Sequence, residues 1–206
     1  MEARILRIYL DELEAQALMA VSAAMALDKI NAIYPHGIRE MDAAQRAQTN
    51  KECFRSVHSF LTHLSNISRL IWPPALSPKQ NCFCDKPRAE GLPCSTCVAR
   101  ARSSRILSAL GIDGEDHVIK NRVLRDHLEH FDERLDYWAK TSVRKNYIQD
   151  LIGPKDWMKG VDASDMMRQY DPTTADFTFR GESHSLITLH DGLQNLLGRT
   201  RSALYG

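Results

Sequence analysis

The sequence predicts a mainly α-helical bundle with a cysteine-rich loop and a small C-terminal α+β extension, and three observations support this. First, apolar residues recur at steps of three and four in several long segments, as they do on one face of a helix. Second, five of the eight prolines lie between Pro73 and Pro93, which is typical of an irregular connection. Third, Phe177 and Phe179 alternate with polar residues just before Gly181, which predicts a small hairpin.

Two long helices are predicted in the N-terminal part of the chain. The first ends before Tyr34-Pro35, and the second ends at Pro73, because proline interrupts the hydrogen bonding of a helix. The apolar stripes consist of Leu13, Ala17, Ala20, Ala24 and Leu27 in the first helix and of Phe54, Val57, Leu61, Leu64 and Ile71 in the second.

Three more helices are predicted farther along the chain. One covers 98–110 and ends at Gly111, since glycine commonly follows the last turn of a helix. Another runs continuously from about 117 to 142 and shows the clearest apolar stripe, and a closing helix covers 189–204. We therefore expect a helical bundle in residues 1–150, with a cysteine-rich insert at about 77–97, and a hairpin and helix packed on it in residues 151–206.

The composition narrows the class of protein. The chain has 206 residues, of which 43% are hydrophobic and 26% are charged, as in ordinary globular proteins. It has 27 basic and 26 acidic residues, so any contact with nucleic acid needs a local basic patch. The longest nearly apolar stretch, 15–27, is shorter than a membrane-spanning helix, and Asp11, Glu12 and Glu14 do not suit a signal peptide. We expect a cytoplasmic protein without a membrane contact.

One segment, residues 121–134, is unusually rich in ionisable side chains. A purely structural interpretation pairs Arg122 with Asp126 and Arg125 with Glu129 at the i,i+4 spacing of a solvated helix face. Each such pair stabilises a helix by only about 0.2–0.5 kcal/mol.

A functional interpretation starts from the run Arg125-Asp126-His127-Leu128-Glu129-His130. This run resembles the ribonuclease motif of the HEPN family, in which arginine is followed by Asn, Asp or His, then by three residues and a histidine. The specific match covers six positions, while the architectural likeness extends over about residues 10–145. The resemblance implies a bundle of four or five helices that acts as a metal-independent endoribonuclease. A toxin or defence role, with an antitoxin or regulatory protein as partner, is implied by the resemblance alone.

The residue types suit cleavage of RNA. The reaction needs a base for the 2′-hydroxyl proton, an acid for the leaving oxygen and a cation for the charge on phosphorus. Histidine titrates near neutrality and arginine matches phosphate oxygens, so His130 and Arg125 fit these roles. Asp126 could hold the tautomer of His130, while His127 is a candidate second acid. Arg122 is a candidate for binding the substrate.

The spacing of the motif has a geometric consequence. On a straight helix, residues five apart point about 140° away from each other. Arg125 and His130 would then not share a face, so either the helix distorts or two chains share their motifs in one cleft. HEPN ribonucleases are known to share the cleft, and the functional interpretation therefore implies a homodimer.

Three alternatives stay open. One is a noncatalytic HEPN-like module that binds nucleotide, RNA or a protein partner in the same cleft. A second is a metal site formed by Asp126, His127 and His130, which have i,i+4 and i,i+3 spacing. A third is a zinc-stabilised interaction protein in which the charged segment is only a solvated face.

Two local clusters, one of cysteines and one of arginines, lie in and just after the proline-rich segment. Two close pairs of cysteines suit a tetrahedral structural zinc, which would order the loop without taking part in catalysis; reduced thiols or a regulatory disulfide are the alternatives. Arginines near this loop could contact phosphates, although a solvated helix face is the default interpretation. The cysteines are Cys82, Cys84, Cys94 and Cys97, and the arginines are Arg88, Arg100, Arg102 and Arg105. Cys53 is expected to be a small buried apolar residue.

Overall fold

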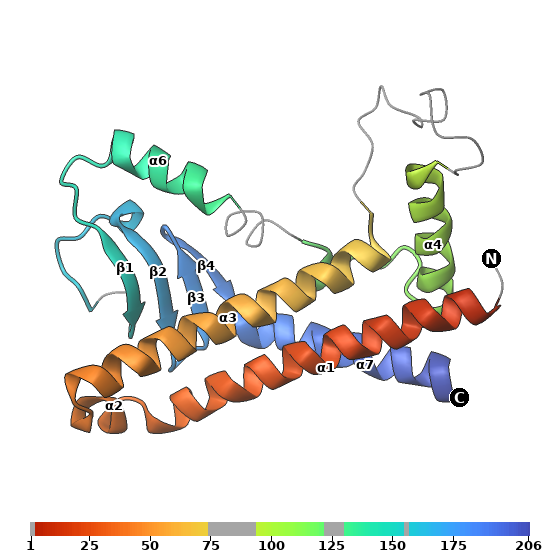
Figure 1. Cartoon of the computed structure of the whole chain (residues 1–206), viewed down its shortest axis with the longest axis horizontal. Coiled ribbons are helices and arrows are strands. Elements are labelled where there is room, and N and C mark those ends of the chain that lie inside the picture. Colours follow the sequence, from red (N-terminus) through yellow and green to blue (C-terminus); the bar gives the residue numbers. More distant parts are fainter. Residues whose placement is uncertain (1–2, 74–93, 122–129, 155–156) are drawn as a thin grey trace.

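The computed structural model describes residues 3–73, 94–121, 130–154 and 157–206. Its frame is an antiparallel pair of long helices, α1 (Ala3–Ile33) and α3 (Ala43–Ile71), which lie side by side and are joined by the short α2 (His36–Glu40) (Figure 1). Alanines at the buried positions of α1 allow the two backbones to approach closely. The buried residues of α1 are Leu10, Leu13, Ala17, Ala20, Ala23, Leu27 and Ile30.

The sequence explains where α3 begins and ends. Asp42 and Gln45 form a reciprocal capping box, in which the Gln45 amide donates to Asp42 Oδ1 at 2.8 Å and the Asp42 amide donates to Gln45 Oε1 at 2.9 Å. The helix ends at Ile71, just before the two prolines. Cys53 is fully buried in it, and burial together with nearby Asp150 raises the pKa of this thiol to about 12. The expectation for Cys53 is confirmed.

Two further helices pack against this pair. α4 (Ser95–Leu110) ends at Gly111, which has a φ of 64°, as predicted for a glycine that terminates a helix. α7 (Leu186–Tyr205) packs along α1 and buries Leu193, Leu196 and Leu197. Ser185 caps α7 by accepting a hydrogen bond from the Thr188 amide.

A four-stranded mixed sheet lies at one end of the helical frame (Figure 1). Its order is β1-β2-β3-β4, with β1 and β2 parallel and the other pairs antiparallel. The predicted hairpin is confirmed by β3 and β4, whose turn contains Gly181. Phe177 is fully buried and lies 6.4 Å from the ring of Phe54 on α3. The bounds are β1 (Ile148–Ile152), β2 (Met166–Asp171), β3 (Asp176–Phe179) and β4 (Glu182–Ser185).

The mainly helical architecture with a small C-terminal sheet and helix is therefore confirmed, whereas the continuous helix over 117–142 is wrong. The chain forms a short 3-10 helix, η1 (Val118–Lys120), Asn121 is extended, and α6 (Phe131–Thr141) begins only after His130.

Tertiary contacts explain the break before Asn121. His117 stacks on Trp72 at 5.5 Å, and Ile119 is buried against the helices. On α7, a Cβ at Gly192 would lie only 2.4 Å from Val118 Cγ1, so η1 packs closely at this glycine. These contacts override the helical pattern of the local sequence.

Among the described residues, none of the helices combines the length and the apolar character that crossing a membrane requires.

Candidate functional site

His130 is the residue of the expected ribonuclease motif that the structure describes. It occupies the N-cap position of α6 with φ −101° and ψ 39°, and its carbonyl accepts the first backbone hydrogen bond of the helix, from the Arg134 amide at 3.1 Å. Its side chain is 56% exposed. The imidazole is therefore accessible to a macromolecular substrate.

A carboxylate holds this imidazole from one side. Oε1 of Glu133 lies 3.3 Å from His130 Nδ1, and both side chains are exposed. A carboxylate at Nδ1 favours the tautomer with its proton on that nitrogen, which leaves Nε2 able to accept a proton. Glu133 was missed in the sequence analysis, although its i,i+3 spacing from His130 was a usable signal.

The other expected motif residues lie outside the described part of the chain. Arg122, Arg125, Asp126 and His127 all fall within 122–129, so their arrangement around His130 is not described. His130 itself is not helical, and the angle of about 140° between Arg125 and His130, derived for a straight helix, does not apply to it. The geometry of a straight helix therefore gives no reason at His130 to expect that two chains share one cleft.

Helix α6 is fixed on the end of the sheet where β2 begins and β3 ends. The ring of Phe131 lies 6.4 Å from that of Phe179, and the Trp138 indole donates to Asp165 Oδ1 at 2.8 Å. The Arg180 guanidinium also donates from Nη1 to the Arg134 carbonyl at 3.2 Å. These contacts hold the first turn of α6, and with it His130, in a defined place.

A largely buried charge cluster lies beneath this helix. Arg168 Nε on β2 is 2.7 Å from Asp150 Oδ1 on β1, and Arg168 Nη1 is 3.4 Å from His58 Nε2 on α3. The same guanidinium packs over the ring of Phe131. Burial lowers the pKa of His58, and Arg168 lowers it further, whereas burial raises the pKa of Asp150 against the opposing effect of Arg168. The cluster ties the sheet, α3 and the start of α6 together.

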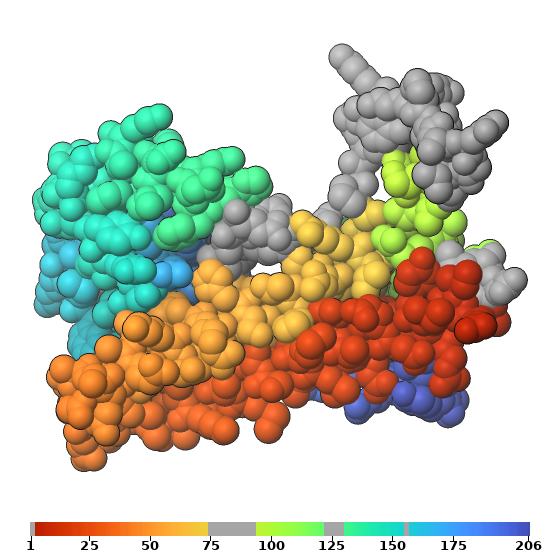
Figure 2. All heavy atoms as spheres, in the orientation of Figure 1, coloured from red at the N-terminus to blue at the C-terminus, as the bar shows by residue number. Residues whose placement is uncertain are grey.

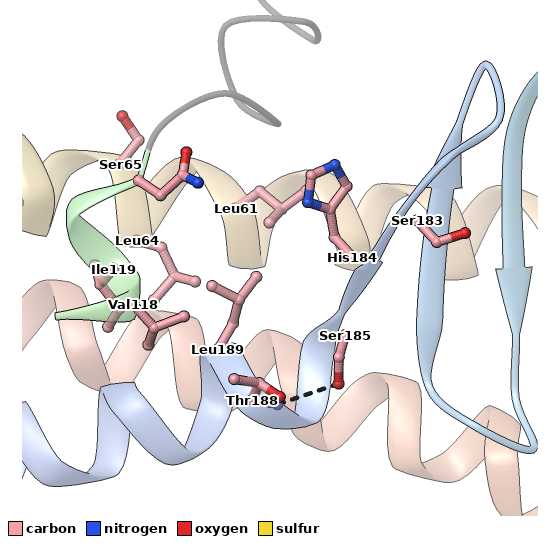
Figure 3. A pocket seen from close by; sticks show the side chains of 11 residues that line it. Leu61, Leu64, Ser65, Val118, Ile119, Ser183, His184, Ser185, Thr188 and Leu189 are labelled. Carbon is pink, nitrogen blue, oxygen red and sulfur yellow. Dashed lines mark hydrogen bonds between the residues drawn. The ribbon is translucent and has the colours of Figure 1, made fainter. Parts of the chain in front are cut away.

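A pocket of about 290 Å³ opens next to Asn121, the last described residue before the motif (Figure 3). Its floor is apolar, formed by leucines of α3 and α7 and by Val118 and Ile119 of η1. His184 projects from β4 into the same space, and Ser185 and Thr188 lie at the start of α7 (Figure 3). An apolar floor with a few polar groups on its rim is typical of a small-molecule pocket.

The arginines of α4 are not placed beside His130. Arg102 donates from Nε to the Leu70 carbonyl and from Nη2 to the Arg69 carbonyl, both at 3.1 Å, so it satisfies the C-terminal end of α3. Arg100 and Arg105 are exposed on the same helix. The sheet below α6 contacts α3 at Phe54, which precedes Leu70 by 16 residues, or about 24 Å along a helix that rises 1.5 Å per residue. In the space-filling view, α4 and α6 stand at different ends of the molecule (Figure 2).

The expected zinc ligands are described in part. Cys94 is buried at the N-cap position of α4, and Cys97 is exposed one turn later, so the i,i+3 spacing suits two thiolates that bind one metal. Cys82, Cys84 and Arg88 lie outside the described residues. Within the ranges that the structure describes, no group of three or more His, Cys, Asp or Glu side chains could hold a metal ion.

Comparisons of the chain with protein-family models, with curated proteins and with solved structures found no match.

Proposed function

We propose that the chain is a metal-independent endoribonuclease of the HEPN type, with His130 as the residue that takes the 2′-hydroxyl proton. The observation that carries the proposal is an exposed His130 whose Nδ1 faces the Glu133 carboxylate, at the end of a run matching the HEPN motif. The pair of long antiparallel helices, α1 and α3, agrees with the expected bundle.

The proposed reaction is an internal transesterification. Nε2 of His130 accepts the proton of the 2′-hydroxyl, and the 2′-oxygen then attacks the neighbouring phosphorus. The bond from phosphorus to the 5′-oxygen breaks, and that oxygen takes a proton from an acid, for which His127 is the candidate. Arg125 stabilises the extra negative charge on the phosphoryl oxygens, and Asp126 orients the histidines. The products are a 2′,3′-cyclic phosphate and a 5′-hydroxyl.

The chemistry of the products tests this proposal. Single-stranded RNA incubated with the protein in EDTA should yield fragments with cyclic-phosphate and 5′-hydroxyl ends, because no metal takes part. RNA with 2′-O-methyl groups should stay intact, because it has no hydroxyl proton to lose. Cleavage of the methylated RNA, or fragments with 5′-phosphate ends, would exclude the mechanism.

The proposal includes a homodimer, which rests on the resemblance rather than on helix geometry, in which one chain supplies Arg125 and its partner supplies the histidine. Mixing two inactive variants, Arg125→Ala and His130→Ala, tests this arrangement. A mixed dimer would then contain one site with both residues intact, so activity should return on mixing. If each chain held a complete site, the mixture would stay inactive. The toxin or defence role, with its antitoxin partner, rests on the resemblance alone.

A structural zinc bound by Cys82, Cys84, Cys94 and Cys97 is the remaining part of the proposal. Cys94 and Cys97 support it through their place in the first turn of α4. Four thiolates would occupy all four positions of a tetrahedral zinc, so the metal would order this segment and leave catalysis to the motif.

A further inference from the structure

An open pocket of about 220 Å³ lies along α6 beyond His130, where α6 meets the turn between β3 and β4. It is lined by Arg134 and Tyr137 of α6 and by Phe179, Arg180 and Glu182 of the hairpin. Arg134 follows His130 by four residues and Tyr137 follows it by seven, so the pocket lies about one to two turns along α6 from His130.

The polar groups of this pocket suit a phosphate. The Nε atoms of Arg134 and Arg180 are buried and have no hydrogen-bond partner among the described residues. Two guanidinium groups face one carboxylate, Glu182, so the net charge of the lining is positive. Guanidinium groups bind phosphate oxygens with paired, charge-assisted hydrogen bonds.

The same pocket offers an aromatic surface. Tyr137 is 58% exposed, and the Arg180 guanidinium lies 5.0 Å from the centre of its ring. An exposed ring next to cationic groups is the arrangement that proteins use to stack a base while they bind its phosphate.

The backbone of Arg180 points to a role beyond folding. Phe179 pairs with Glu182, so Arg180 and Gly181 form a two-residue turn, and their φ angles are 48° and 90°. Such a turn favours asparagine, aspartate or glycine at its first position, and an arginine there is conformationally unfavourable. An unfavourable residue whose side chain faces an open pocket is typical of a functional position.

We propose that this pocket binds a nucleotide of single-stranded RNA next to the one that is cleaved, with its phosphate on Arg134 and Arg180 and its base against Tyr137. The choice of RNA rests on the proposed function, and the pocket deepens it by assigning a substrate-binding surface on α6. Arg134, Tyr137 and Arg180 are then binding residues, distinct from the arginines of α4 that the sequence suggested.

The test measures the affinity of a fluorescently labelled single-stranded RNA by anisotropy, with the His130→Ala protein so that the RNA stays intact. Replacing both Arg134 and Arg180 by glutamine should raise Kd roughly tenfold and reduce the slope of log K against log salt by about 0.7, for the one phosphate that the two arginines bind. Replacing the exposed Arg39 of α2 and Arg46 of α3 by glutamine serves as the matched control and should change Kd less than twofold.

Three milder variants keep the test independent of folding defects. Tyr137→Leu should weaken binding roughly tenfold while Tyr137→Phe keeps it, because a phenylalanine ring still stacks on a base. Arg180→Asn places a favoured residue in the turn, which offsets the lost hydrogen bond from Arg180 to the Arg134 carbonyl, so Tm should change little while affinity falls.

An unchanged Kd in the Arg134, Arg180 and Tyr137 variants would overturn the inference. So would polyglutamate that competes with the labelled RNA as effectively as unlabelled RNA does. RNA cleavage with unaltered affinity in these variants would leave the proposed function standing and remove only the subsite. Conversely, if the wild type cleaves no RNA while the variants bind RNA more weakly, that result would support the subsite and contradict the proposed ribonuclease activity.

Discussion

Oε1 of Glu133 lies 3.3 Å from Nδ1 of His130, one turn into the helix that begins directly after this histidine. The carboxylate and the imidazole are both exposed, so their contact contributes little to the stability of the fold. Its effect on the proposed chemistry is larger, because a carboxylate near Nδ1 favours the tautomer that carries its proton on that nitrogen.

Replacing Glu133 by alanine is therefore expected to lower the rate of RNA cleavage about tenfold, less than the loss of the histidine itself, while stability changes by no more than about 0.5 kcal/mol. Single-turnover rates and urea unfolding measure the two effects. Glu52→Ala is the matched control, since Glu52 forms an exposed i,i+3 ion pair with Arg55 on α3. Equal rates in both variants and the wild type would show that Glu133 has no role in catalysis.

Substitutions at two glycines of α7 test whether η1, which precedes the motif, packs closely on this helix. Gly192→Ala places a Cβ about 2.4 Å from Val118 Cγ1, so η1 must shift, and we expect a loss of about 1–3 kcal/mol of stability. Gly198→Ala on the same helix meets nothing within 4 Å and should stabilise the protein by about 1 kcal/mol, since alanine favours helix. Urea unfolding of the two variants should give opposite signs; the same sign for both would argue against close packing of η1 on α7.

Stability should decrease as the pH falls below about 6.5, the usual pKa of histidine. Burial and Arg168 lower the pKa of His58 in the folded protein, so the unfolded chain binds a proton first, and acid shifts the equilibrium toward it. His58→Gln keeps an acceptor for Arg168 but cannot titrate. Unfolding measured at pH 7.5 and pH 5.5 should show a smaller difference for this variant than for the wild type, and an equal difference would exclude His58 as a cause.

Zinc content tests the cysteine proposal. The purified protein should contain about one zinc per chain, and Cys94→Ser and Cys97→Ser should each lose most of it, because a tetrahedral site needs all four ligands. Cys53→Ala should keep the metal, since Cys53 is buried within α3. Elemental analysis measures these contents; a protein without zinc, or variants that retain it, would contradict the assignment.

Much of the helical frame could be predicted from the sequence because local signals agree with the packing there. The apolar stripe of α1, the prolines after α3 and Gly111 after α4 each correspond to a boundary or a buried face. The pair β1 and β2 was not predicted, because Met166–Asp171 has no alternation of apolar and polar residues and its parallel partner lies some distance back along the chain.

The residues of the candidate site could be predicted only where their spacing along one helix brings them together. His130 was found from the motif, and Glu133, Arg134 and Tyr137 follow it at helical intervals that a search could have used. Arg180 could not be found in this way, because the hairpin brings it to α6 through tertiary structure. The break in the predicted helix at Asn121 could likewise not be predicted from the sequence, because it depends on contacts of the η1 segment with Trp72 and Gly192.

The proposed role of His130 as a general base is tested by the rate at which single-stranded RNA is cleaved in EDTA by the wild type, by His130→Ala and by His36→Ala, whose histidine is exposed on α2. Loss of a general base typically costs a factor of about 100 or more. The proposed ribonuclease mechanism predicts a fall in cleavage rate of this size for His130→Ala and the wild-type rate for His36→Ala. Equal cleavage by all three proteins, or no cleavage by the wild type, would contradict it and favour a noncatalytic binding module.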